Sequence, residues 1–154
     1  MGKQKAVLSQ ASGPIKDFAQ LGKPKLSTLV VISAVFCFVL GSDELDWSKV
    51  LWLILGGFLV TMSSNAFNQI IERDLDKLMD RTRNRPLPAG RLTVSAAMTF
   101  AVITGILGTL ILWFRMNPLS GILGFAALIL YSLVYTPLKR KTPFAVFVGA
   151  FPGA

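Results

Sequence analysis

Long apolar runs separated by short polar or charged segments are the dominant pattern of this chain. Four such runs cover approximately residues 26–41, 50–71, 92–114 and 118–134. A helix of about 20 apolar residues spans a hydrocarbon core about 30 Å thick. The pattern therefore predicts an all-α fold, a polytopic transmembrane helical bundle with about four spans.

Two further segments complete the predicted organisation. A surface helix lying along the membrane is expected from Ile15 to Leu21, and Pro24 suits the first turn of the first span. A fifth apolar segment opens at Thr142 and is too short, at about 12 residues, to cross a bilayer. We therefore expect a cytoplasmic N-terminal segment over residues 1–25, a membrane domain over residues 26–154, and a fifth span that has only begun.

The basic residues of the chain are distributed unequally between the two sides of the predicted membrane spans. The formal net charge is +8, which at first suggests nucleic acid as a partner. If the N-terminus is cytoplasmic, however, only Lys49 and Arg115 fall on the opposite side of the four spans. The other fourteen basic residues then share the cytoplasmic side, as the positive-inside rule requires: Lys3, Lys5, Lys16, Lys23, Lys25, Arg73, Lys77, Arg81, Arg83, Arg85, Arg91, Lys139, Arg140 and Lys141. The expected partner is thus the lipid bilayer, with no nucleic acid.

The chemistry of the chain is concentrated in residues 68–87, directly after the second apolar run. Asn68, Glu72, Asp76 and Asp80 are spaced by four residues, whereas Asp74 points largely away. At 3.6 residues per turn, each step of four drifts by only about 40°, so these side chains stack along one side of a helix. Oxygen ligands of this kind suit Mg²⁺, which proteins hold with one or two carboxylates together with substrate phosphates.

Basic residues next to this ladder favour a phosphate-containing ligand. Arg81, Arg83 and Arg85 can form charge-assisted hydrogen bonds to phosphate oxygens. Tyr135 and Lys139, at the end of the fourth span, would lie on one helical side provided that the helix continues through Pro137. The hypothesis is a metal-chelated, arginine-clamped diphosphate with an apolar tail.

An ordinary cytoplasmic loop is the alternative interpretation of residues 68–87. Glu72, Asp76 and Asp80 could pair with Arg73 and Lys77 on a solvated helical face. That interpretation does not require a polar ladder that begins inside the span, as this one does at Asn68. Likewise, Tyr at an interface and Lys as a topology anchor are both common features of membrane proteins.

The same residues resemble a known family. Asn68-x3-Glu72-x3-Asp76, followed by Arg81-Thr82-x-x-Arg85-Pro86-Leu87, resembles the first aspartate-rich motif of the UbiA-type intramembrane prenyltransferases. The common form of that motif has aspartates where this chain has Gln69 and Glu72. The variant form, with residues 21–25 before the first span and residues 135–140 after the fourth, is similar to the branch that farnesylates heme B.

The resemblance implies a nine-helix membrane bundle with an acidic motif in each half, of which this chain matches only the first half. It implies Mg²⁺ held by Asn68, Glu72 and Asp76, which are also the expected catalytic residues. Diphosphate binding is implied for Arg81, Arg85, Tyr135 and Lys139. The implied activity is farnesyl transfer from farnesyl diphosphate to heme B in a plasma (inner) membrane, with this chain inactive alone because half of the site is missing.

Two other functions remain open at this point. One is a prenyltransferase that acts on a quinone precursor, and the other is a non-catalytic membrane protein that binds cations or assists assembly. The chain has no histidine, so no heme ligand supports the acceptor. Oligomeric state and the role of Asp80 are likewise open.

Overall fold

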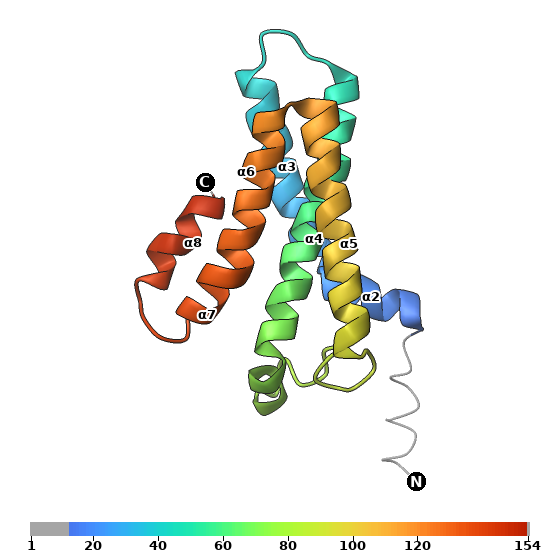
Figure 1. Ribbon diagram of the computed structural model, residues 1–154, viewed down its shortest axis with the longest axis vertical. Helices are drawn as coiled ribbons and strands as arrows, with labels where there is room; N and C mark the ends of the chain where they lie inside the picture. Colours follow the sequence, from blue (N-terminus) through green and yellow to red (C-terminus); the bar gives the residue numbers. More distant parts are fainter. Residues whose placement is uncertain (1–12, 154) are drawn as a thin grey trace.

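The computed structural model describes residues 13–153, so the first part of the predicted N-terminal segment, residues 1–12, lies outside the described residues together with residue 154. Every regular element that it describes is helical (Figure 1). In chain order these are α2 (Pro14–Gly22), α3 (Pro24–Gly41), α4 (Trp47–Leu78), α5 (Val94–Ile111), the π-helix η1 (Leu112–Met116), α6 (Pro118–Ile129), the π-helix η2 (Leu130–Tyr135), α7 (Thr136–Leu138) and α8 (Ala145–Gly153).

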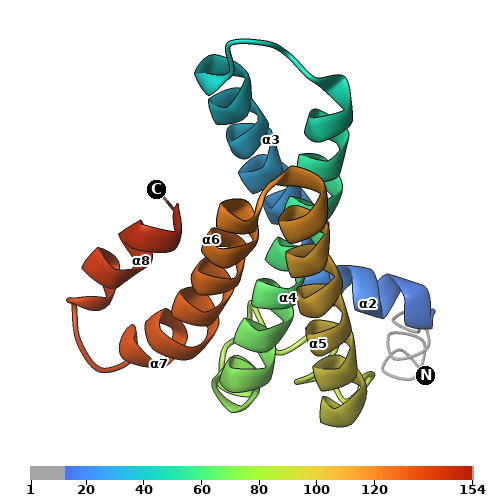
Figure 2. The ribbon, with the colours of Figure 1, turned by 45° about the horizontal axis from the view of Figure 1, so that its top comes forward.

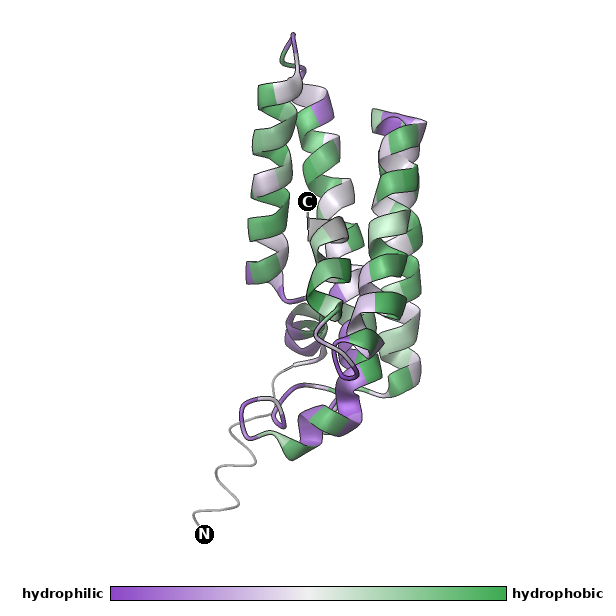
Figure 3. Ribbon diagram, turned by 90° about the vertical axis from the view of Figure 1, so that its left-hand side faces the viewer, coloured by the Kyte–Doolittle hydropathy of each residue, from purple (hydrophilic) through white to green (hydrophobic). Residues whose placement is uncertain are grey.

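The all-α, polytopic architecture is confirmed. Four helical stretches are long and apolar enough to cross a membrane: Pro24–Gly41, Trp47–Leu78, Val94–Met116 and Pro118–Leu138. The fifth apolar segment forms α8, which lies beside α6 and η2 in both views (Figures 1 and 2). Hydrophobic residues cover the middle of the long helices, whereas hydrophilic residues gather near their ends (Figure 3). The chain is therefore an integral membrane protein.

Helix α4 is the centre of the bundle. It contacts α2, α3, α5, α6 and α7. In its most apolar 18-residue segment, 33% of the residues are buried, against 11% for α3. Its start is fixed by Asp46, whose carboxylate accepts hydrogen bonds from the backbone N–H groups of Ser48 (2.9 Å) and Lys49 (3.4 Å). Its end is at Leu78, because Met79 has an extended backbone. The polar last third of the helix is thus held inside the bundle.

Small residues allow α4 and α5 to pack closely. A Cβ atom on Gly108 would lie 2.8 Å from the Val60 backbone nitrogen and 2.9 Å from the Gly56 carbonyl oxygen. The Ser63 hydroxyl donates a 2.6 Å hydrogen bond to the Ala101 carbonyl across the same interface. Small residues and interhelical hydrogen bonds are the usual means by which membrane helices associate.

Replacing Gly108 with alanine is expected to destabilise the bundle by about 1–3 kcal/mol, a typical cost of overpacking. The added Cβ meets backbone atoms of α4, which cannot rotate away as a side chain could. Thermal unfolding in detergent measures the effect. Gly41→Ala is the control, because nothing lies within 4 Å of a Cβ there, and equal stability of the two variants would contradict the prediction.

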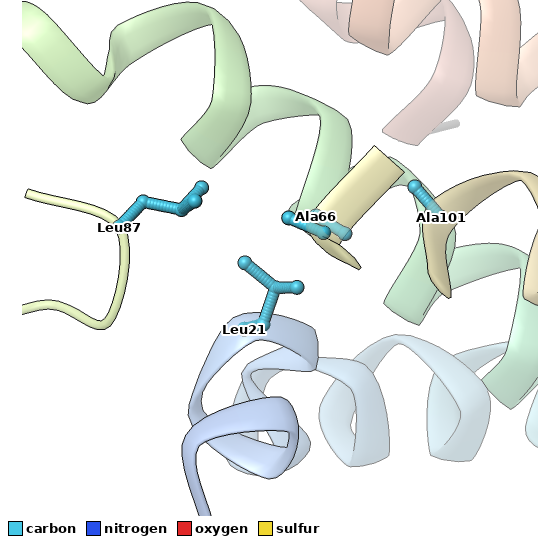
Figure 4. Close-up of a cluster of buried hydrophobic side chains, with 5 residues drawn as sticks. Leu21, Ala66, Leu87 and Ala101 are labelled. Atoms are coloured by element: carbon cyan, nitrogen blue, oxygen red, sulfur yellow. The ribbon is translucent and has the colours of Figure 1, made fainter. Parts of the chain in front are cut away.

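Helix α2 is anchored to the rest of the protein at both of its ends. Its Asp17 carboxylate accepts a 2.9 Å hydrogen bond from Arg91 Nε, in the segment before α5. At its C-terminal end Leu21 is fully buried and points toward Ala66 of α4, with Leu87 and Ala101 close by (Figure 4). This agrees with the predicted helix over residues 15–21 and fixes the point where the chain enters α3.

Candidate functional site

The acidic residues in and after the last turns of α4 differ in their solvent exposure. The Glu72 and Asp76 side chains are 12% and 6% exposed, and Asn68 is buried above them. The Asp80 side chain is 93% exposed, because α4 ends at Leu78 and the next residues leave the helix. The buried ladder therefore consists of Asn68, Glu72 and Asp76, while Asp80 lies outside it.

Two basic residues meet the ladder from other parts of the chain. Lys139 Nζ lies 2.7 Å from Glu72 Oε1, and Arg85 Nη1 donates a 2.8 Å hydrogen bond to Asp76 Oδ2. The loop that carries Arg85 is tied to α4, since the Thr82 hydroxyl donates to the Asp76 carbonyl at 3.0 Å. Four of the predicted site residues are thus brought together as two ion pairs.

The region around Pro137 places Tyr135 beside Lys139. The helix does continue through Pro137, because it widens into the π-helix η2 before the proline and resumes as α7. Lys139 Nζ lies 5.7 Å from the centre of the Tyr135 ring, which stacks on Tyr131. A cleft of about 370 Å³ opens beside these residues, lined also by Arg140 and Lys141 among others. This cleft carries three basic side chains, as an anion site requires.

Arg81 is placed differently from the other predicted residues. It is exposed in the turn after α4 and makes no ion pair with any residue that the structure describes. Arg83, its neighbour, pairs with exposed Asp80 at 3.1 Å. A phosphate-binding role for Arg81 stays a prediction.

Two buried amides on α4, Asn65 and Gln69, were assigned no role from the sequence, unlike Asn68. Gln69 Nε2 donates to the Leu21 carbonyl at 2.8 Å, and Asn65 Nδ2 donates to the Gly22 carbonyl at 3.3 Å. Asn68 Oδ1 accepts a 3.1 Å hydrogen bond from the Thr136 hydroxyl. A carboxylate at position 69 could not donate these hydrogen bonds, which accounts physically for glutamine at that position.

Lys23 also belongs to this region, although sequence reasoning did not assign it to the site. Burial lowers the pKa of its ammonium, and Arg85 lowers that pKa further, while the Glu72 carboxylate opposes the shift. Weaker effects of Lys139 and Asp76 have the same signs as those of Arg85 and Glu72 respectively. The available signal was the Gly22-Lys23-Pro24 break, which turns the chain directly beside α4.

The donor set suits a metal that is shared with a phosphate ligand. No group of three or more His, Cys, Asp or Glu side chains suited to a metal occurs among residues 13–153. Two buried carboxylates and an amide oxygen are too few for a closed protein site, but they match Mg²⁺ bound jointly by one or two carboxylates and phosphate oxygens. Glu72, Asp76 and Asn68 are the residues that fit this role.

An apolar cleft of about 330 Å³ reaches the same end of α4. It lies between α4, α5 and α6, and its lining includes Phe67, next to Asn68, and Ser132, one turn before Thr136. Almost all of its other lining side chains are aliphatic or aromatic. The polar site and an apolar space thus lie within one helical turn of each other, an arrangement that suits an amphipathic ligand.

Comparison with known proteins assigns a family to this arrangement. A protoheme IX farnesyltransferase of Christiangramia forsetii is 50% identical over 140 residues, which are 91% of this chain and 46% of that protein. A protein of the same name from Flavobacterium psychrophilum is 46% identical over 148 residues, covering 92% and 49% of the two chains. The mitochondrial protoheme IX farnesyltransferase of Yarrowia lipolytica is 42% identical over 137 residues, covering 89% and 29%.

The chain spans about half the length of the bacterial relatives, or less of the mitochondrial one. No solved structure matches it. The model of the UbiA prenyltransferase family matches residues 29–154, which is most of the chain and includes the whole ladder. The chain belongs to the UbiA prenyltransferase family.

Proposed function

We propose that the complete protein is a protoheme IX farnesyltransferase, which transfers the farnesyl group of farnesyl diphosphate to a vinyl group of heme B and yields heme O. The observation that carries this proposal is the meeting of Glu72 and Asp76 with Lys139 and Arg85 beside an apolar cleft. The names of the relatives at 42–50% identity support the choice of donor and acceptor.

The chain's own residues would bind and orient the donor. Arg85 and Lys139 exchange their carboxylate partners for diphosphate oxygens, and Tyr135 and Arg81 assist from either side. Glu72, Asp76 and Asn68 would hold Mg²⁺, and the bound ion would supply positive charge to stabilise the departing diphosphate. The farnesyl chain lies in the apolar cleft, where Phe67 offers an aromatic face.

Bond changes in this reaction balance with water as the only further reactant. The allylic C–O bond of the donor breaks, and the diphosphate leaves with the electron pair. The allylic carbon bonds to the vinyl group, and water captures the resulting carbocation with loss of a proton. Excluding water until the new carbon–carbon bond has formed is a role for the apolar cleft.

The proposal places the protein in the plasma (inner) membrane with its N-terminus and the charged site on the cytoplasmic side. The imbalance of basic residues supports that orientation, because the four-span topology predicts fourteen of the sixteen on the side of the site.

Acceptor choice is the test of this function. Membranes that contain the complete gene product receive farnesyl diphosphate and Mg²⁺ with either heme B or 4-hydroxybenzoate. We expect heme O by chromatography and mass spectrometry in the first mixture and no prenylated benzoate in the second. The reverse pattern would indicate a quinone-precursor prenyltransferase, and no product from either acceptor would favour a non-catalytic cation-binding protein.

A further inference from the structure

Lys23 occupies the break between α2 and α3 with an unusual backbone. Its φ of 49° and ψ of 67° lie in the left-handed region, and no other non-glycine residue in the described part of the chain has a positive φ. A Cβ atom disfavours this conformation, which glycine adopts freely. A strained residue of this kind persists only where its surroundings hold it, and such residues cluster at functional sites.

Buried polar groups hold the backbone on both sides of Lys23. Before it, Gln69 Nε2 donates to the Leu21 carbonyl at 2.8 Å, and Asn65 Nδ2 donates to the Gly22 carbonyl at 3.3 Å. The Ser27 hydroxyl, after it in the chain, also donates to the Gly22 carbonyl at 2.9 Å. These polar groups are buried, so water cannot compete for their hydrogen bonds. The backbone around Lys23 is therefore held firmly.

The same helix that carries the acidic ladder also fixes this break. Asn65 and Gln69 are one turn apart on α4, while Asn68 and Glu72 follow each other on an adjoining side of it. The break packs closely against α4, since a Cβ on Gly22 would lie 2.6 Å from the Met62 methyl carbon. The separation between the ladder and the break is therefore set by one rigid element.

The charges of both ion pairs of the site act on the Lys23 ammonium, which joins neither pair. It makes no ion pair with any of residues 13–153, yet the charges of Glu72, Asp76, Arg85 and Lys139 all act on it. Within each pair, a carboxylate already balances a cation. Lys23 thus adds positive charge that neither pair balances to a partly buried site, and a multiply charged anion is the ligand that would balance it.

We propose that Lys23 is a further diphosphate-binding residue of this site, and that Gln69 is a positioning residue that holds Lys23 in its left-handed conformation. The proposal rests on the proposed function for the identity of the anion. The Gln69 side chain donates its hydrogen bonds to the backbone carbonyls of Gln20 and Leu21, so we assign its role to positioning Lys23.

Binding of inorganic diphosphate to the complete protein in lipid nanodiscs, measured by calorimetry with Mg²⁺ present, tests the role of Lys23. We expect Lys23→Gln to weaken binding about tenfold or more, as loss of a charge-assisted hydrogen bond does. Lys25→Gln is the matched control, because Lys25 is exposed two residues further on, and its affinity should stay within about twofold. Equal affinities of the two variants would overturn the proposal.

Lys23→Gly separates binding from folding. Glycine adopts the left-handed conformation without strain, so this variant should unfold at nearly the same temperature as the wild type. Its affinity for diphosphate should nevertheless fall as in Lys23→Gln. A glycine variant that binds diphosphate as tightly as the wild type would overturn the proposal even if the glutamine variant folded poorly.

A double-mutant cycle tests the positioning role of Gln69. Gln69→Leu removes the amide donors while keeping similar volume, and we expect it to weaken diphosphate binding about fivefold to tenfold with Lys23 present. In the Lys23→Gly background the same substitution should cause no further loss. Equal losses in both backgrounds would mean that Gln69 acts independently of Lys23 and would overturn its assignment.

The diphosphate-binding and heme O experiments together distinguish failure of the Lys23 site from failure of the proposed function. A wild-type protein that binds diphosphate in a Lys23-dependent manner but forms no heme O would contradict the farnesyltransferase assignment and support the Lys23 site. A protein that forms heme O with unchanged diphosphate affinity after Lys23→Gln would support the function and exclude the site.

Discussion

Replacing Glu72 or Asp76 with alanine is expected to lower farnesyl transfer by the complete protein by at least about 10²–10³-fold. Both carboxylates lie in the buried ladder on α4, and in the proposed function they would hold the metal that neutralises the departing diphosphate. Each substitution also releases a cation, Lys139 or Arg85, from its partner. Heme O formed per molecule of membrane-inserted protein is the quantity to measure.

Asp74→Ala is the control for these variants. Asp74 lies on the same helix but is exposed, and it pairs only loosely with Arg73 at 3.7 Å and with Lys77 at 3.8 Å. Its substitution should leave turnover within about twofold, because exposed pairs contribute little. Unchanged heme O production in both Glu72→Ala and Asp76→Ala would remove the proposed mechanism.

Arg85→Gln should reduce both stability and turnover. The guanidinium is the partner of the Asp76 carboxylate at 2.8 Å, and both groups are largely buried. Removing one member of such a pair leaves a buried charge, at a cost of about 3 kcal/mol. Thermal unfolding reports the stability, and the KM for farnesyl diphosphate, expected to rise about tenfold or more, reports the phosphate contact.

A double variant, Asp76→Asn with Arg85→Gln, separates these two effects. Two neutral amides can hydrogen-bond to each other, so stability should recover most of the loss, while turnover should stay at least about 10²-fold below that of the wild type. Arg83→Gln is the control, since its pair with Asp80 is exposed and should contribute less than about 1 kcal/mol. A double variant as unstable as Arg85→Gln alone would show that the ion pair is not the cause.

The spans could be predicted from the sequence because a bilayer leaves few alternatives for a run of 20 apolar residues. Their ends were harder to place. Helix α4 continues to Leu78, beyond the apolar run that ends near residue 71, because Glu72 and Asp76 find cations inside the fold. Pro137 does not end the fourth span, since a π-helical turn accommodates it.

Spacing by four residues predicted correctly that Asn68, Glu72 and Asp76 share a buried side of one helix. It could not decide on Asp80, because the ladder is interrupted by the end of α4 at Leu78 and no motif marks that residue. A local pattern carries information about one helix only. The assignment of Arg81 to the diphosphate site still awaits an experiment.

Contacts between distant parts of the chain were beyond the reach of sequence patterns. Lys139 and Glu72 are 67 positions apart, and their pairing depends on how α7 packs beside α4. Gln69 was noted only as a departure from the common motif, and its structural role could not be predicted because its hydrogen bonds go to backbone carbonyls, which every residue possesses. Lys23 was noted only as part of a flanking segment, and its backbone angles require the folded chain.

Glu72 pairs with Lys139 and Asp76 pairs with Arg85, so both carboxylates are neutralised by cations of the same chain. This bears on how their charge is balanced while the helices assemble. A membrane protein whose buried carboxylates depended on a metal for neutralisation would need that metal while its helices assembled in the bilayer. Here cations encoded in the same chain neutralise both carboxylates as soon as α7 and the loop after α4 reach their places. In the described part of the chain, neither carboxylate therefore needs a metal ion to balance its charge once the helices have packed.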